Sequence, residues 1–157
     1  MKTENKKIYE LHSPANQLHA TIGIEDARLW YELLDESGDA IIARSYVSLT
    51  ANDTNLLTFS DEPEVSEARF DETWEQPWGE QRYVRNHYNE VAVSSSSATV
   101  RFRLFDDSIG FRYELSGESP LTIQREETDF NVAQDSHAWW IPALGQNHYE
   151  HLYKRTT

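Results

Sequence analysis

The sequence lacks cysteine, a basic excess and any long apolar run. With no Cys among its 157 residues, the chain has no disulfides, no thiolate metal sites and no Cys nucleophile, although this leaves the cellular compartment open. Its 27 Asp and Glu outnumber 14 Lys and Arg, and the formal net charge of −13 argues against partners such as nucleic acid or anionic membrane surfaces. No apolar run approaches the roughly 20 residues of a membrane helix, and the first residues lead into no stretch of signal-peptide length.

Aromatic content excludes disorder, the other interpretation of an acidic chain. Phe, Trp and Tyr make up 12% of the residues, whereas disordered acidic segments are poor in aromatics. A chain of this length fits one domain and buries roughly 70% of the surface that its unfolded form exposes. We therefore expect residues 1–157 to form a single globular domain with a sizeable core.

Alternation of apolar and polar residues predicts β-structure. Val100, Phe102 and Leu104 alternate with arginines, and the pattern resumes over residues 111–115 after a short loop containing Asp and Gly, which is typical of a β-hairpin. Further strands are expected at residues 18–24, 28–34, 40–49, 88–93 and 122–130. No amphipathic helix of 12 residues or more is evident. Short strands at this spacing predict an all-β sandwich, mostly antiparallel, with few or no helices.

Acidic residues concentrate in one part of the chain. Residues 61–80 hold eight acids and one base, Arg69, which accounts for −7 of the net charge of −13. This stretch is interpreted either as a solvated loop and strand edge or as a surface that meets a basic or cationic partner.

Three segments have residue types that sandwich packing does not explain. Residues 70–80 carry two Trp around a Pro and before a Gly, which predicts an aromatic loop, because such a stretch cannot lie in one regular strand. Residues 85–90 place five hydrogen-bonding side chains just before an expected strand, which indicates a polar network between loops. The third segment, residues 137–151, combines Trp139 and Trp140 with His148, Glu150 and His151.

The third segment raises the question of a metal. His148, Glu150 and His151 could bind zinc, but on a strand His148 and Glu150 share a face that His151 does not. A carboxylate such as Glu150 suits a hard cation such as Ca²⁺, which takes oxygen ligands from separate segments. The sequence has no Gly-x-Ser-x-Gly, no Gly-rich phosphate loop and no His-Glu-x-x-His, so no catalytic set can be assigned.

Taken in order, these motifs resemble the N-terminal domain of glycoside hydrolase family 97, the bacterial α-glucosidases and α-galactosidases. The stretches that carry the resemblance are residues 11–14, 70–80, 85–90, 101–105, 109–114 and 138–142. The resemblance implies an N-terminal β-supersandwich followed by a catalytic (β/α)₈ barrel and a small C-terminal β-domain. The catalytic carboxylates of the family lie on the barrel, so the resemblance implies that this chain is inactive alone.

The resemblance also implies a supporting role for named residues. Glu150 matches the glutamate that the N-terminal domain donates to a Ca²⁺ site beside the barrel's active site, although the match needs a one-residue insertion after Pro142. The domain would wall the pocket that binds an α-linked oligosaccharide, of α-glucoside type. Substrate contact is expected at Trp139, Trp140 and His148. Contact with the barrel, or a structural role, is expected at Trp74, Trp78, Glu80, Arg85, Asn86, His87 and Asn89.

The cellular compartment and the function each have a second interpretation. Family members are expected in the bacterial periplasm, yet residues 1–7 lead into no apolar stretch of signal-peptide length. The alternative function is a free-standing carbohydrate-binding module that stacks sugars on its tryptophans, which predicts that the 157-residue protein binds maltooligosaccharides by itself.

Exposed aromatics on an isolated domain predict self-association. Large apolar patches that another domain normally covers favour contacts between copies. We expect sedimentation velocity of the 157-residue protein to show a dimer that grows with concentration. A monomer that persists at high concentration would contradict this expectation.

Overall fold

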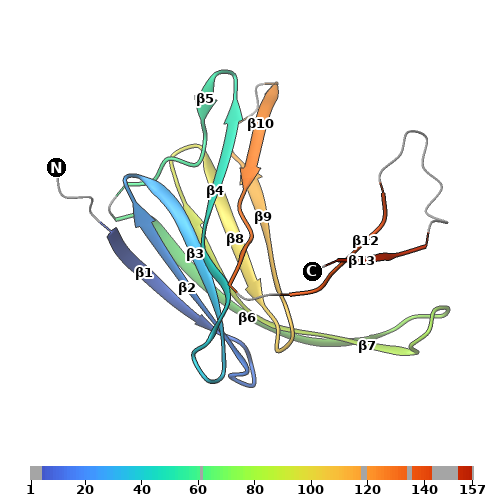
Figure 1. Ribbon diagram of the computed structural model, residues 1–157. Helices are drawn as coiled ribbons and strands as arrows, with labels where there is room; N and C mark the ends of the chain where they lie inside the picture. Colours follow the sequence, from blue (N-terminus) through green and yellow to red (C-terminus); the bar gives the residue numbers. More distant parts are fainter. Residues whose placement is uncertain (1–4, 61, 118–119, 134–135, 143–151, 157) are drawn as a thin grey trace.

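The computed structural model describes residues 5–60, 62–117, 120–133, 136–142 and 152–156. Its thirteen strands, with no helix in those ranges, form two larger antiparallel sheets and one small ribbon. The prediction of an all-β sandwich is therefore confirmed (Figure 1). The described ranges hold no helix long and apolar enough to cross a lipid bilayer.

The first sheet has its five main strands in the order β1-β2-β3-β4-β10, with two short strands also paired to β4. Its strands are β1 (Asn5–His12), β2 (Leu18–Glu25), β3 (Arg28–Asp35), β4 (Ala40–Ala51), β10 (Ile123–Thr128) and the two-residue strands β5 (Thr54–Asn55) and β11 (Asn131–Val132). The second sheet, in the order β6-β7-β8-β9, holds β6 (Glu64–Glu75), β7 (Tyr83–Ser94), β8 (Ala98–Leu104) and β9 (Ile109–Leu115). A separate ribbon pairs β12 (Ala138–Trp140) with β13 (Lys154–Thr156).

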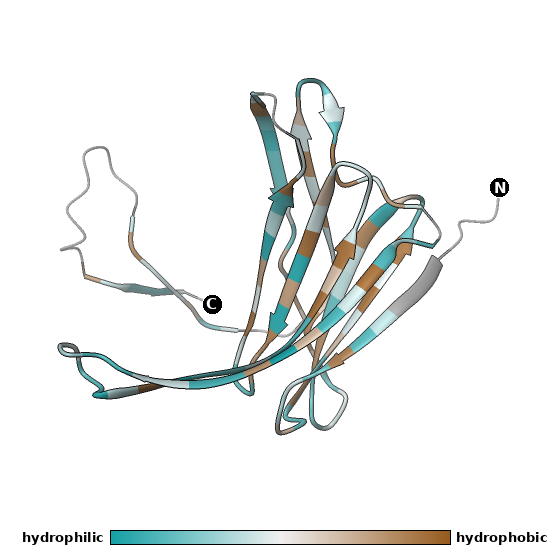
Figure 2. Cartoon of the chain, turned by 180° about the vertical axis from the view of Figure 1, so that it is seen from behind, coloured by the Kyte–Doolittle hydropathy of each residue, from teal (hydrophilic) through white to brown (hydrophobic). Residues whose placement is uncertain are grey.

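The strands expected from alternation are all present. Val100, Phe102 and Leu104 are fully buried on β8, and β8 joins β9 by a tight turn in which the Phe105 N–H donates to the Ser108 carbonyl at 2.9 Å. In the meander, the turn after β3 is fixed by an Asp35 carboxylate oxygen that accepts the N–H groups of Ser37 and Asp39, both at 2.9 Å. Figure 2 shows the alternation of apolar and polar residues along the strands of both sheets.

The core between the sheets centres on aromatic rings. Tyr31 of β3 is fully buried and lies 5.9 Å from the ring of Phe102 and 5.4 Å from that of Phe111. Its hydroxyl donates to the Asp129 carbonyl at 2.8 Å, and burial raises the pKa of Tyr31 to about 12. Because the hydroxyl is hydrogen-bonded, the ring can be buried without leaving a polar group unsatisfied.

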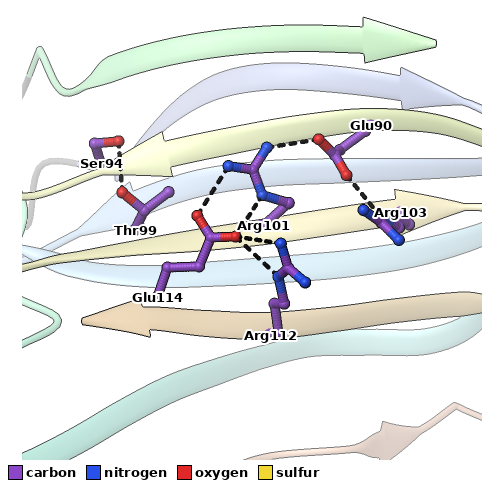
Figure 3. A network of polar contacts seen from close by, with 7 residues as sticks. All are labelled: Glu90, Ser94, Thr99, Arg101, Arg103, Arg112 and Glu114. Atoms are coloured by element: carbon purple, nitrogen blue, oxygen red, sulfur yellow. Dashed lines mark hydrogen bonds and ion pairs between the residues drawn. The ribbon is translucent and has the colours of Figure 1, made fainter. Parts of the chain in front are cut away.

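An ion network covers the outer face of the second sheet (Figure 3). Glu90 of β7 is only 5% exposed, and its two oxygens accept hydrogen bonds from Arg101 and Arg103, both at 2.6 Å. Arg101 also forms a bidentate pair with Glu114 at 2.8 Å, and Arg112 reaches the same carboxylate at 2.6 Å. Arg101 therefore links both carboxylates across three strands.

The network lowers the pKa of both acids. Hydrogen bonds from Arg101 and Arg112 lower the pKa of Glu114 to about 2. Burial raises the pKa of Glu90, but hydrogen bonds from Arg103 and Arg101 outweigh that effect and leave it below its usual value. Because both folded-state values lie below the unfolded one, about 4.3 for Glu, the network adds stability above that pH, and this stability is lost as the pH falls toward 2.

We predict that Arg101→Met lowers the free energy of unfolding at pH 7 by about 2–3 kcal/mol, because it removes a partner from the buried Glu90. It should also flatten the loss of stability between about pH 5 and pH 2. Urea unfolding at a series of pH values measures both effects. The control is Arg125→Met, which breaks the exposed Arg125–Glu127 pair and should change neither value; equal pH profiles for the two variants would contradict the prediction.

Candidate functional site: an aromatic arm and ribbon

Part of β6 and β7 continues beyond the sandwich as a two-stranded arm, defined here as residues 70–88. β7 pairs with β8 only from Asn89 to Ser94, whereas it pairs with β6 along its whole length, out to Tyr83 opposite Glu75. The outer halves of both strands therefore have no third strand in the described structure. Figure 1 shows them running together away from the sandwich, to the same side as the β12–β13 ribbon.

The structure corrects the local predictions for this region. Residues 70–75 form the end of β6 and are not a loop, and residues 85–90 lie inside β7 instead of preceding a strand. Alternation failed here because every residue of β6 is exposed, so neither face carries an apolar pattern. The acidic stretch around them is accordingly an exposed edge strand, as the first of the two interpretations expected.

The two tryptophans of the arm lie in different elements. Trp74 is on β6 and 46% exposed, whereas Trp78 lies in the connection between the strands and is 84% exposed. Gly79 has a φ of +125°, and a Cβ there would come within 2.6 Å of the Gln76 side chain. The Gln76 amide in turn donates to the Gln81 carbonyl. Gly79 and the Gln76 hydrogen bond therefore define the conformation of the tip, in which Trp78 is exposed. Glu80, next to the glycine, is exposed as well.

One face of the arm carries paired charges. Arg85 forms a bidentate pair with Asp71, in which Nε donates to Oδ1 and Nη2 donates to Oδ2, both at 2.8 Å. These hydrogen bonds lower the pKa of Asp71. His87 Nε2 lies 3.9 Å from the same carboxylate. Sequence reasoning did not single out Asp71, because its place opposite His87 follows only from the β6–β7 register.

At the base of the arm, Asp71 and His87 line an open crevice of about 290 Å³, together with Pro14, Arg69, Phe70 and Asn89. The Asn89 amide donates to the His12 carbonyl at 2.8 Å, which ties the second sheet to the end of β1. This contact is compatible with the structural or interface role expected for Asn89, which stays a prediction. His87 is half-buried beside Asp71 and lines the same crevice.

The opposite face of the arm is partly aromatic. Phe70 stacks on Tyr88 with ring centroids 5.4 Å apart, and Tyr88 contacts Phe105 at 5.3 Å. Asn86, opposite Glu72 on this face, is half-buried. Trp74 lies on the same face, nearer the tip, because residues 70, 72 and 74 share one side of the strand. The arm therefore exposes apolar surface where the sandwich no longer supports it.

The β12–β13 ribbon presents the other pair of predicted tryptophans. Trp139 is 66% and Trp140 41% exposed. Arg155 lies 5.7 Å from the Trp139 ring and Lys154 5.3 Å from the Trp140 ring, so each ring has a cation over one face. Neighbouring residues on a strand point to opposite sides, so the two tryptophans do not form one platform.

The residues predicted to bind a cation and to contact substrate from the neighbouring loop, Glu150 and His148, lie outside the described residues. Within the described ranges, no three His, Asp or Glu side chains come together in a way that could hold a metal ion. The described part of the chain therefore provides no complete cation site of its own.

Comparison with known proteins gives a consistent picture. A model of the glycosyl-hydrolase 97 N-terminal family matches residues 11–157. A retaining α-galactosidase of Bacteroides thetaiotaomicron is 28% identical over 139 residues, which are 86% of this chain and 20% of that protein. A glycoside hydrolase family 97 enzyme from Pseudoalteromonas sp. strain K8, solved with acarbose, shows 29% identity and a TM-score of 0.75 over 94% of this chain and 24% of its own.

Two further findings qualify these likenesses. The structure of a β-arabinopyranosidase is 17% identical, with a TM-score of 0.70 over 83% of this chain and 22% of its own, and supports the fold alone. In every one of these comparisons the chain spans only about a fifth to a quarter of the length of its relative.

We predict that the arm opens far more readily than the sandwich, because a lone two-stranded ribbon is marginally stable in water. In hydrogen–deuterium exchange of the 157-residue protein, the amides of residues 83–88 should exchange about 100-fold or more faster than those of residues 89–94 on the same strand. Equal protection along the whole of β7 would show that the arm is held by contacts beyond its own pairing.

Proposed function

This chain belongs to the N-terminal domain family of glycosyl hydrolase 97, and from that premise we propose that it supports an α-glucosidase-type enzyme without carrying the catalytic carboxylates. In this role it contacts the catalytic (β/α)₈ barrel, walls one side of the substrate pocket and donates one ligand to a Ca²⁺ site. The observation that carries the proposal is the family match over residues 11–157 in a chain only a fifth to a quarter as long as its relatives.

Contact with the barrel is assigned to the arm, and contact with the sugar to the β12–β13 ribbon. Both extend to the same side of the sandwich (Figure 1), and both expose aromatic rings, led by Trp78 at 84% and Trp139 at 66%. A two-stranded arm with bare Trp side chains is stabilised when a neighbouring domain covers it. Trp74, Trp78 and Glu80 would form the contact at the tip, with Arg85 held in place by Asp71.

The Ca²⁺ ligand is assigned to Glu150. Ca²⁺ takes six to eight oxygens, and the described residues contain no cluster of acids that could supply them. A single carboxylate from this domain would therefore need barrel carboxylates to complete the shell. Ca²⁺ bound there would supply a fixed positive charge beside the substrate pocket.

An α-glucoside is the proposed substrate class. The Pseudoalteromonas enzyme, 29% identical to this chain, was solved with acarbose and, as a variant, with panose, and both ligands are α-linked oligosaccharides. The Bacteroides relative is a retaining α-galactosidase at 28% identity, so the proposal rests on the bound ligands and not on the identity. Trp139, Trp140 and His148 are the proposed contacts of this domain with sugar.

The test replaces Glu150 with Gln in the enzyme that contains this domain and its barrel. We expect Ca²⁺ activation of aryl α-glucoside hydrolysis to weaken by about 10-fold or more, since loss of even an outer-shell partner of a metal site typically costs about 10- to 100-fold. Glu36→Gln is the matched control, because it removes an exposed carboxylate from the turn after β3, outside the arm and the ribbon, and should leave Ca²⁺ activation unchanged. If Glu150→Gln keeps the normal Ca²⁺ dependence, the role assigned to Glu150 is wrong.

A further inference from the structure

The sandwich has an open groove on the side away from β1 and β6. It lies between β9 of the second sheet and β10 of the first, with a volume of about 390 Å³. The groove is lined chiefly by Ile109, Phe111, Tyr113, Glu126, Thr128 and Phe130. Neither the arm nor the ribbon described above contributes to it, so the groove is a second, separate surface.

The floor of the groove is the edge of the aromatic core. Phe111 stacks on Phe130 with ring centroids 5.8 Å apart, and Phe111 lies 5.4 Å from the buried Tyr31. Phe130 is nevertheless 58% exposed. The Tyr113 hydroxyl and the Thr128 hydroxyl lie 2.6 Å apart and join the two sheets. The core is thus closed at one point along this side and left uncovered at Phe130.

Backbone groups along β9 are also uncovered. Hydrogen-bonded pairs alternate with non-hydrogen-bonded pairs in an antiparallel ladder. Phe105–Ser108 and Ser97–Ser116 are hydrogen-bonded at either end of the hairpin. The register between them therefore directs the N–H and C=O groups of Gly110, Arg112 and Glu114 toward β8.

The remaining residues of β9 direct their backbone N–H and C=O groups away from β8. These are Ile109, Phe111, Tyr113 and Leu115, and of the strands that the structure describes, β8 alone pairs with β9. Three of the four, Ile109, Phe111 and Tyr113, also line the groove, together with Gly110 and Arg112 of the same strand. A free backbone edge beside an apolar groove is the arrangement in which an added strand gains hydrogen bonds and side-chain burial together.

We propose that this groove is the docking site of a β-strand from the part of the enzyme polypeptide beyond residue 157. That strand would pair with the free edge of β9 and place alternate apolar side chains against Phe111 and Phe130. The proposal rests on the family assignment, because the relatives are about four times as long as this chain. It does not depend on Glu150 or on sugar binding.

A second copy of the chain is a poorer occupant. Antiparallel pairing of β9 with its own copy about the middle of the strand would set Arg112 against the Arg112 of that copy. Arg112 already has a 62% exposed side chain in its pair with Glu114, and like charges directly opposite on a sheet are destabilising. A strand of different sequence has no such conflict.

The test compares amide exchange in two proteins, the 157-residue chain and the polypeptide extended to the end of its reading frame. In the short chain, the amides of Ile109, Phe111, Tyr113 and Leu115 should exchange faster than those of Gly110, Arg112 and Glu114. In the extended polypeptide those four should slow by about 100-fold or more, as expected for amides that enter a ladder.

Three outcomes would overturn the proposal. They are unchanged fast exchange of the four amides in the extended protein, a reading frame that stops at codon 157, and protection in the short chain that rises with its concentration. The last would assign the groove to a second copy. The readout needs neither Ca²⁺ nor substrate. Strand docking can therefore fail while the proposed function holds, and the proposed function can fail while strand docking holds.

A variant adds a side-chain test. Phe130→Asp should leave the exchange pattern of the short chain largely unchanged, because the ring is already more than half exposed. In the extended protein it should remove the protection of Phe111 and Tyr113, since the added strand would face a buried acid. Ile41→Asp, an apolar-to-acidic change at a 40% exposed position of β4, is the control and should keep that protection.

Discussion

The unequal lengths of β7 and β8 determine the shape of this domain. β7 has twelve residues, and β8 pairs with only the last six, so one half of β7 lies in the core and the other half is carried out of it. Val91 and Val93 are fully buried on the inner half, and their burial holds the whole strand in position. The arm, its paired charges and its exposed tryptophans all follow from the length that β8 leaves uncovered.

Sequence alone predicted the parts of the fold in which one face is buried. The hairpin of β8 and β9 was found because Val100, Phe102 and Leu104 alternate with arginine. The arm was missed because every residue of its β6 strand is exposed, so that strand carries no apolar period. Its strand character comes from pairing between distant residues such as Asp71 and His87, which a single sequence does not reveal.

The candidate site was predictable only as residue types. The four tryptophans outside the core were recognised as unusual, and the structure exposes all of them. Their grouping into an arm and a ribbon depends on register, as does the Arg101 network. Glu150 and His148 were singled out by resemblance and lie outside the described residues, so their roles stay predictions.

The two edges of the second sheet differ in chemistry. β6, the edge on one side, carries acidic residues on a fully exposed strand, and charge on an edge strand discourages pairing with other chains. β9, the edge on the other side, places apolar rings beside its free backbone groups. The net charge of −13 is thus not a uniform property of the surface, because much of it protects one edge and leaves the other without that protection.

The ion network on the outer face limits how this architecture can be enlarged. Tyr88, Glu90 and Ala92 are buried on that face, with exposed fractions of 6%, 5% and 3%, because the arginine side chains already lie over the sheet. A third layer stacked there would have to displace the paired arginines and would leave the buried Glu90 charge without a partner. On the side of the second sheet, additions to the domain are therefore easier in the plane of the sheet, at its edges, than as a further layer over that face.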